Sequence, residues 1–226
     1  MAAYDEIADW YENQFLTSRR LPLGAPGRDP LDIDRTIRQL LGEGVGVCLE
    51  IGCGTGINAH VVRELGWVPV GVDLSVGMLG HALLRLPVAL ADAKRLPFRD
   101  SGIPAVVSVM VHTDMPGYPD IIQEAARVLE PGGVLVHVGV HPCFCGGFAD
   151  RADPEAVVVR RGYLDRHWTT DSWTDQGLRD KVGAAHWSMP ELLHAFLDAG
   201  LAVERFAEGG SPTPMVFAVR ARRGPR

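Results

Sequence analysis

The chain has 226 residues, of which 46% are hydrophobic and 22% are charged, and its formal net charge is −6 at pH 7. This length and apolar content are enough for one folded domain with a full core. The acidic balance and the absence of a long basic run disfavour nucleic-acid binding, and no long apolar stretch or signal pattern indicates membrane insertion or secretion.

The first 41 residues are expected to form a helical lid. An amphipathic segment from Tyr4 to about Leu16 predicts a first helix. A loop rich in Pro, Gly and Arg follows over Thr17–Pro30, and a second helix is expected over Leu31–Leu41.

A glycine-rich segment then follows a short apolar run. The run from Val45 reads as a buried strand, with Glu50 near its end and Gly52, Gly54 and Gly56 directly after it. Glycines allow a sharp turn and a close approach to a ligand, because they have no Cβ. A helix beginning near Asn58 would direct free N–H groups at that ligand. The segment predicts a nucleotide-type cradle, although an ordinary glycine-rich turn is the alternative.

The details of this segment favour one cofactor. A dinucleotide fingerprint needs a further glycine where Ile57 stands, and the chain has no triphosphate-binding P-loop motif. Glu50 would repel a pyrophosphate but attract an amino group. These features favour S-adenosylmethionine over NAD.

Two further acids end the next two apolar runs. Asp73 is predicted to accept hydrogen bonds from ribose hydroxyls, and Ser75 to cap a helix on which Met78 covers an adenine face or joins the core. The run Val88–Ala91 leads to Asp92, which could accept from the exocyclic amine of adenine or be an ordinary solvated acid.

The later elements continue the alternation of strands and helices that is typical of a parallel sheet covered on both faces. We expect a buried strand over Ala105–Val111, a helix over Asp120–Glu130 stopped by Pro131-Gly132-Gly133, and a fifth strand. A capping box begins at Ser188, and its helix is expected to extend to about Ala199. The final strands are expected over Leu201–Glu208 and Thr213–Arg220 as an antiparallel hairpin.

These motifs together resemble class I S-adenosylmethionine-dependent methyltransferases, in the small-molecule branch called type 11. The resemblance rests on LEIGCGTG at 49–56, GVDLS at 71–75, ADAKRLPF at 91–98, EAARVLEPGGVLVHV at 124–138 and the opening Tyr4–Tyr11 segment. It implies a Rossmann-like doubly wound α/β fold with a seven-stranded, mostly parallel sheet, an antiparallel last strand and helices on both faces. One departure is Ser101–Ala105, where the family usually has an acid and an aromatic residue before its fourth strand.

The resemblance also implies the cofactor site. Glu50 and the glycines would hold the methionine moiety, Asp73 the ribose, and Asp92 the adenine amine. The full set of expected cofactor-binding residues is Tyr4, Tyr11, Glu50, Gly52, Gly54, Gly56, Asn58, Asp73, Leu74, Met78, Asp92, Ala93 and Val109.

The segment 141–187 interrupts the alternation and is rich in aromatic residues. It contains Trp168, Trp173 and Trp187, together with several Phe, Tyr and His side chains. We expect a substrate-lid insertion between a cofactor-binding core at 45–140 and a C-terminal helix and hairpin at 188–226, all within one domain. A hydrophobic cluster that only covers the sheet edge is the alternative.

A general base is needed only if the acceptor must lose a proton. Histidine suits this role near neutral pH, and His112, His141 and His186 are the candidates in that order. A purely structural role is the alternative for each.

No metal site is expected. Asp114, the acid just after the fourth strand, has no second ligand pair beside it, and the His141–Cys145 cluster lacks zinc-site spacing.

The sequence thus predicts methyl transfer from S-adenosylmethionine by direct displacement to an O or N atom of a small molecule. No N-P-P-[YF] motif for planar amino groups follows the fourth strand. The alternatives are a cofactor-binding protein that transfers no methyl group or promotes another reaction, and an NAD-dependent oxidoreductase. The four cysteines suggest reduced thiols in a cytoplasmic protein, while monomer and homodimer stay open.

Overall fold

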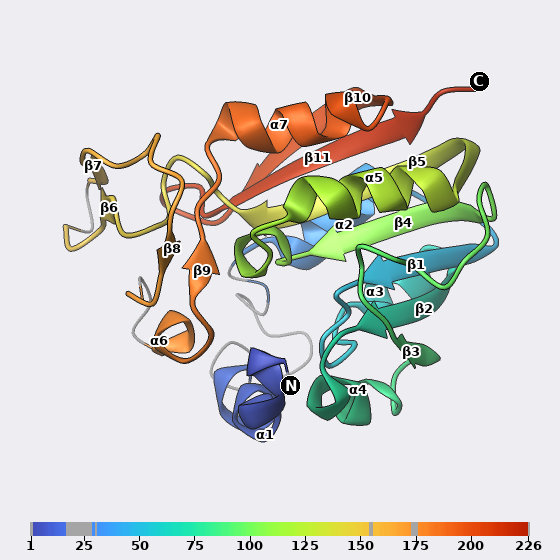
Figure 1. Cartoon of the computed structure of the whole chain (residues 1–226), viewed down its shortest axis with the longest axis horizontal. Helices are drawn as coiled ribbons and strands as arrows, with labels where there is room; N and C mark the ends of the chain where they lie inside the picture. Colours follow the sequence, from blue (N-terminus) through green and yellow to red (C-terminus); the bar gives the residue numbers. More distant parts are fainter. Residues whose placement is uncertain (1, 17–28, 30, 154–155, 173–175, 226) are drawn as a thin grey trace.

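A seven-stranded sheet organises the chain. The computed structural model describes residues 2–16, 29, 31–153, 156–172 and 176–225. The strands follow the order β10-β11-β5-β4-β1-β2-β3 (Figure 1). Their bounds are β1 Val47–Ile51, β2 Val68–Asp73, β3 Val88–Leu90, β4 Ile103–Val109, β5 Leu129–Val140, β10 Leu201–Gly209 and β11 Val216–Arg223.

The strand directions confirm the predicted fold class. β1 is parallel to β2 and β4, β4 is parallel to β5, and β2 is parallel to β3. The last strand, β11, is antiparallel to both β5 and β10. The chain order reverses between β1 and β4, and open α/β sheets bind ligands at the carboxyl ends of such a pair.

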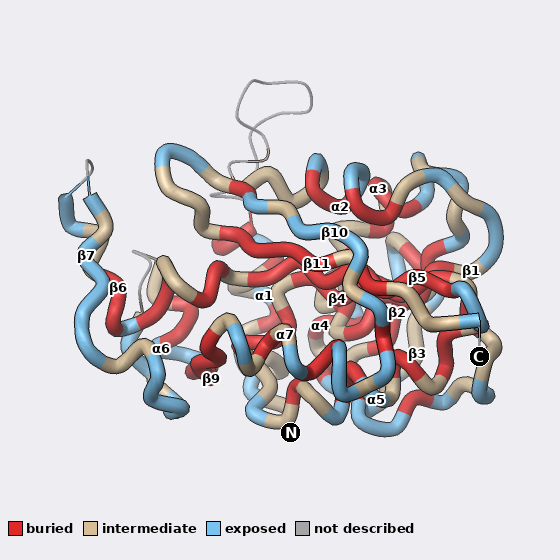
Figure 2. The backbone as a smooth tube through the Cα atoms, turned by 90° about the horizontal axis from the view of Figure 1, so that it is seen from above, coloured by how far each residue is buried: buried red, intermediate tan, exposed pale blue. Residues whose placement is uncertain are grey.

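Helices cover both faces of the sheet, so the strands have two cores (Figures 1 and 2). Alternate strand residues face opposite sides, and neighbours such as Val106 and Val107 therefore belong to different cores. One core packs under α5 and α7, and the other packs under α2 and α3. The helices are α2 Ile33–Leu41, α3 Ala59–Glu64, α4 Val76–Ala82, α5 Tyr118–Val128 and α7 Met189–Asp198.

The predicted boundary between the fifth strand and the helix before it was wrong. α5 ends at Val128, and β5 already begins at Leu129, which pairs with Ile103 of β4. The Pro131-Gly132-Gly133 sequence lies inside β5, where the register with β4 shifts. The pairing with Ile103 therefore fixes the end of the helix, because it draws Leu129 into the sheet.

The N-terminal segment is helical but irregular. It comprises a 3-10 turn η1 (Ala3–Glu6), a short α1 (Ala8–Trp10) and a π-helical turn η2 (Tyr11–Phe15). Of the predicted loop Thr17–Pro30, only Asp29 lies within the described residues. The lid role of this segment stays a prediction.

The segment 141–187 lies at the end of the sheet where β4 and β5 finish (Figure 1). Its regular elements are β6 Ala149–Asp150, β7 Val158–Val159, β8 Trp168–Thr169, α6 Leu178–Val182 and β9 Ala184–Ala185. Trp173 lies outside the described residues. Within the described part of the chain, no helix is both long enough and apolar enough to cross a membrane.

Candidate active site

The glycine turn after β1 adopts the conformation that its sequence predicts. Gly52, Gly54 and Gly56 have φ values of +64°, +53° and +74°, which side-chain-bearing residues rarely adopt. A Cβ on Gly52 would lie 2.6 Å from Val111, whereas a Cβ on Gly54 would meet nothing within 4 Å. The backbone is therefore bare at Gly54, where a ligand could approach it closely.

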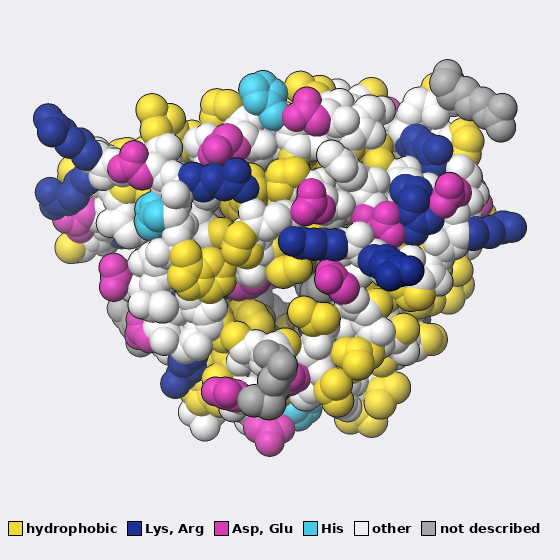
Figure 3. All heavy atoms as spheres, in the orientation of Figure 1, with side chains coloured by type: hydrophobic (Ala, Val, Ile, Leu, Met, Phe, Trp, Pro, Cys, Tyr) yellow, Lys and Arg dark blue, Asp and Glu magenta, His cyan; other side chains and the backbone are white. Residues whose placement is uncertain are grey.

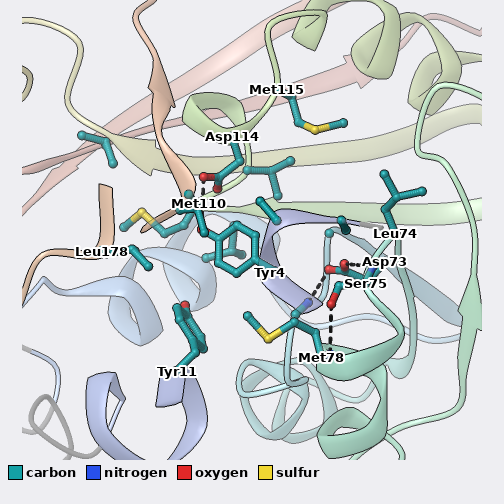
Figure 4. Close-up of a pocket in the computed structure, with 18 of the residues that line it drawn as sticks. Tyr4, Tyr11, Asp73, Leu74, Ser75, Met78, Met110, Asp114, Met115 and Leu178 are labelled. Carbon is teal, nitrogen blue, oxygen red and sulfur yellow. Dashed lines mark hydrogen bonds between the residues drawn. The ribbon is translucent and has the colours of Figure 1, made fainter. Parts of the chain in front are cut away.

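Asp73, at the end of β2, holds this turn in place. Its Oδ2 accepts a 2.8 Å hydrogen bond from Gly54 N, and its Oδ1 accepts one of 2.9 Å from Ser75 N (Figure 4). Burial raises the pKa of Asp73, although these backbone donors oppose the shift. Each carboxylate oxygen has two lone pairs, so both oxygens retain capacity for a ligand hydroxyl.

Glu50 is buried beneath the turn with half of its carboxylate unpaired. Oε1 accepts a 2.7 Å hydrogen bond from Asn58 Nδ2, but Oε2 is buried without a partner among the described residues. Burial raises the pKa of this carboxyl to about 7, and the Asn58 hydrogen bond opposes the shift. A buried carboxylate without full pairing is costly, and a cationic ligand group would offset that cost.

A cavity of about 340 Å³ opens beside these residues, and Figure 3 shows the surface hollowed near the centre of this face. Nine of the predicted cofactor-binding residues line it: Tyr4, Tyr11, Gly52, Gly54, Asp73, Leu74, Met78, Ala93 and Val109. A neighbouring hollow of about 830 Å³ is lined by Gly56 and Asn58 and shares Gly52 and Gly54 with the first. The sheet therefore brings eleven of the thirteen predicted residues to these two hollows, whereas Glu50 and Asp92 line neither of them.

Asp92 is placed differently from its predicted neighbours. Ala91 and Ala93 line the 340 Å³ cavity, but Asp92 itself is not among the lining residues. Its side chain is exposed, and Oδ1 accepts a 2.9 Å hydrogen bond from Lys94 N. Its contact with an adenine amine stays a prediction.

Hydrogen bonds join the N-terminal segment to the start of α4, beside the cavity. Asp5 Oδ1 accepts hydrogen bonds from Ser75 Oγ at 2.7 Å and from Gly77 N at 3.1 Å, at the start of α4. Ser75 also caps α4 as predicted, since its hydroxyl accepts from Met78 N. These contacts bring Tyr4 across the cavity, between Asp73 and Asp114 (Figure 4).

None of the three predicted histidine bases lines the 340 Å³ cavity. His112, His141 and His186 instead border a separate recess of about 10 Å³, which is barely large enough for one water molecule. The chain turns at Met110, which has a φ of +60°, and His112 then packs into the core. The structure therefore gives no support to a histidine base that acts on an acceptor in the 340 Å³ cavity.

Each of these histidines also has a structural explanation. His112 is 2% exposed and packs edge-to-face against His137. His141 Nε2 donates to Glu208 Oε1 at 2.9 Å, and His186 Nε2 donates to the carbonyl of Tyr163 at 2.6 Å. Burial lowers the pKa of both His112 and His186, which favours their neutral forms.

Two charged residues, Asp114 and Arg179, line the cavity although the sequence did not single them out as binding groups. Asp114, on the 3-10 turn η4 (His112–Asp114), pairs with Arg179 of α6, and Arg179 Nη2 also donates to Thr113 Oγ1 at 2.9 Å. For Asp114, the sequence offered one indication of a binding role, namely its position directly after the fourth strand. For Arg179, the sequence offered no such indication. Among the described residues, no group of three or more His, Cys, Asp or Glu side chains could hold a metal ion.

The aromatic side chains of the segment 141–187 contribute little to the cavity wall, which this segment lines mainly through Leu178, Arg179 and Val182. Trp168 lines the cavity, but Trp187 is buried, and its indole nitrogen donates to the carbonyl of His112 at 3.1 Å. Phe148, Tyr163 and His186 pack against one another, with the Phe148 and His186 ring centres 4.7 Å apart. The substrate-lid role of this segment stays a prediction.

Comparisons with known proteins agree with the fold and with the family that the sequence motifs predict. Residues 49–137 match the family model described as a methyltransferase domain. The chain is 32% identical over 121 residues to a probable phthiotriol/phenolphthiotriol dimycocerosates methyltransferase 2 of Mycobacterium ulcerans, which covers 50% of this chain and 45% of that protein. It is 36% identical over 159 residues to a demethylmenaquinone methyltransferase of Mycobacterium sp. strain KMS, covering 62% of this chain and 66% of that one.

The fold has close counterparts among solved structures. An S-adenosylmethionine-dependent methyltransferase from Mesorhizobium loti superimposes with a TM-score of 0.71 at 23% identity, covering 84% of this chain and 96% of that one. The chain spans less than half the length of the Mycobacterium ulcerans relative. The sheet order, the glycine turn and these matches agree: residues 49–137 belong to the methyltransferase-domain family, and the chain has the fold of class I S-adenosylmethionine-dependent methyltransferases.

Proposed function

We propose that this protein transfers a methyl group from S-adenosylmethionine to an oxygen or nitrogen atom of a small-molecule acceptor. The observation that carries this proposal is the buried Oε2 of Glu50, which has no partner in the described part of the chain and lies beside a glycine turn held by Asp73. A cofactor with an ammonium group and a ribose has complementary groups for both acids. A pyrophosphate would bring a second negative charge toward Glu50, which argues against NAD.

The residues present fit this cofactor along the cavity. Glu50, with Asn58 holding its other oxygen, would bind the amino group, and the bare backbone at Gly54 would lie against the methionine chain. Asp73 would accept the ribose hydroxyls, and Leu74 and Met78 would cover the adenine. When bound, the cofactor supplies a methyl group on a positively charged sulfur, which a nucleophile can displace.

The protein's own contribution is positioning and exclusion of water. Tyr4 and Tyr11 from the N-terminal segment and Leu178 and Val182 from α6 line the cavity opposite the strand ends. They enclose it together with the loop after β4, so an acceptor would be held in a largely apolar space. Aligning two reactants in this way supplies much of the rate of a displacement reaction.

A small molecule is the acceptor class that the cavity and the relatives support. The relatives are named for demethylmenaquinone and for phthiotriol dimycocerosates, and neither name refers to a nucleic acid or a protein. The net charge of −6 also gives no electrostatic attraction for nucleic acid. We therefore propose no nucleic-acid partner, and a cytoplasmic location remains part of the proposal.

The decisive experiment combines cofactor binding with product detection. Calorimetric titration with S-adenosylmethionine, S-adenosylhomocysteine and NAD is expected to show binding of the first two only. Incubation with labelled S-adenosylmethionine and panels of phenols, carboxylates and amines should then yield S-adenosylhomocysteine and a labelled acceptor. Binding without turnover on any panel would favour the non-transferring alternative, and tight binding of NAD alone would refute the proposal.

A further inference from the structure

The two carboxylate oxygens of Asp114 differ in their hydrogen bonds. Oδ1 accepts a hydrogen bond from the Tyr4 hydroxyl at 3.1 Å (Figure 4) and another from Arg179 Nη1. Oδ2 has no hydrogen-bond partner among the described residues, and Asp114 lines the 340 Å³ cavity. The carboxylate therefore presents one acceptor oxygen to the cavity.

The surroundings of Asp114 are otherwise apolar. Its neighbours in the cavity wall include Met110, Met115, Leu178 and Val182. The other carboxylate in that wall, Asp73, already accepts a backbone N–H on each oxygen and faces the ribose position of the proposed cofactor. Asp114 is thus the acid at the cavity end away from Asp73, where an acceptor would lie.

Arg179 and Tyr4 fix the orientation of this carboxylate. Arg179 is only 6% exposed, and it also donates to Thr113 Oγ1 at 2.9 Å and to Gly183 O at 3.2 Å. The guanidinium of Arg179 thus donates to Asp114, Thr113 and Gly183, which fixes its position and, through it, the position of Asp114 Oδ1. Oδ2 is the carboxylate oxygen that neither Arg179 nor Tyr4 contacts through a hydrogen bond. Burial raises the pKa of Asp114, and the charge of Arg179 opposes that shift.

We propose that Asp114 binds the acceptor and takes up its proton, and that the acceptor is an apolar molecule carrying a hydroxyl group. This inference rests on the proposed methyl transfer. Oδ2 accepts a hydrogen bond from the acceptor hydroxyl, whose oxygen is the nucleophile. As the oxygen–methyl bond forms, the sulfur–methyl bond breaks and its electron pair stays on sulfur, while the hydroxyl proton moves to Oδ2. Arg179 and Tyr4 are positioning residues, because they act through Asp114.

This proposal distinguishes between acceptor types. An apolar wall with one hydrogen-bond acceptor favours a phenol or alcohol over the corresponding ether, which has no proton to donate. It also disfavours a carboxylate acceptor, because a second negative charge would lie beside Oδ2.

A pair of matched probes tests the inference. 1-Naphthol and 1-methoxynaphthalene differ at the hydroxyl, and their affinities are measured by calorimetry on protein saturated with S-adenosylhomocysteine. The wild type is expected to bind 1-naphthol about tenfold more tightly than its methyl ether, as for a hydrogen bond to a charged group. In Asp114→Asn, the preference should fall to about threefold or less. Asp120→Asn, which changes an exposed acid on α5, is the matched control and should keep the wild-type preference.

The controls separate this inference from the proposed function and from misfolding. A wild type that does not bind S-adenosylhomocysteine refutes the proposed function itself. Normal binding of S-adenosylhomocysteine, together with no preference in the wild type, no probe bound at all, or an unchanged preference in Asp114→Asn, overturns the Asp114 assignment. Because Asp114→Asn removes the carboxylate charge beside the buried Arg179, the double variant Asp114→Asn/Arg179→Gln removes both charges and must show the same loss of preference.

Turnover gives a second readout that a merely structural role would not change. If 1-naphthol is methylated, Asp114→Asn should lower kcat by about a hundredfold, the usual scale for a lost proton acceptor, while KM changes far less. An effect confined to KM would contradict proton uptake by Asp114.

Discussion

The pH dependence of cofactor binding gives a sharp test of the role of Glu50. Burial raises the pKa of its carboxyl to about 7 in the free protein, and Oε2 has no partner among the described residues. A cofactor ammonium binds the carboxylate form, so the proton must leave before or during binding. Because the pKa is raised, affinity should be full above pH 7 and should fall as the pH drops below it.

The magnitude follows from the fraction of Glu50 that is ionised. With a pKa of about 7, that fraction is roughly 0.9 at pH 8 and roughly 0.1 at pH 6. The dissociation constant of S-adenosylhomocysteine should therefore rise about tenfold from pH 8 to pH 6, which corresponds to about 1.4 kcal/mol. Calorimetry at several pH values measures this directly, and the amino group of the ligand stays charged over this range.

Glu50→Gln isolates the effect. Glutamine keeps the shape and can still accept from Asn58, but it cannot ionise, so its affinity should be independent of pH between 6 and 8. At pH 8 the variant should bind at least about tenfold more weakly than the wild type, because a charge-assisted hydrogen bond is lost. Glu43→Gln, on the exposed turn before β1, should keep the wild-type slope. A flat profile in the wild type, or an unchanged slope in Glu50→Gln, would refute the reasoning.

Three further predictions concern the site and its support. Asp73→Ala should weaken S-adenosylmethionine binding about tenfold, since a charge-assisted hydrogen bond is lost; an unchanged affinity in calorimetry would contradict the ribose assignment. Burial lowers the pKa of His137 to about 3, below its unfolded value, so its contribution to stability is full above about pH 6.5 and is lost as the pH falls. In urea unfolding, the free energy of unfolding should fall by about 2 kcal/mol between pH 7 and pH 5 because of His137, and the variant His137→Gln should lack this contribution. Gly139→Ala should cost about 1–3 kcal/mol, because its Cβ would lie 2.4 Å from the His112 ring, whereas Gly80→Ala on α4 meets nothing and should not destabilise the protein.

The cofactor half of the site was predictable because its chemistry is local in sequence. A turn with three positive φ angles requires glycine, and Gly52, Gly54 and Gly56 mark that requirement without any knowledge of the fold. Asp73 could be placed near them because parallel strands that are neighbours end at the same edge of the sheet. Helix caps such as Ser75 are equally local, and the predicted cap was confirmed.

The acceptor half could not be predicted in the same way. Tyr4, Asp114 and Arg179 meet at one carboxylate oxygen, although they come from the N-terminal segment, the turn after β4 and α6. No spacing rule joins residues separated by 110 and 65 positions. None of the three predicted histidines lines the cavity, and for His112 the reason is related, because the backbone turns at Met110, two residues before it.

The sequence by itself determined the order of strands and helices, the glycine turn, the acids that end β1 and β2, and through them the cofactor. These features depend on backbone sterics and on the periodicity of apolar residues, which act over a few neighbouring positions. Only the tertiary structure decided that β5 starts at Leu129, that the three predicted histidines lie outside the cavity, and that Asp114 lines it with Oδ1 bound by Tyr4 and Arg179. Strand pairing and side-chain packing join distant segments, and no local pattern encodes their geometry.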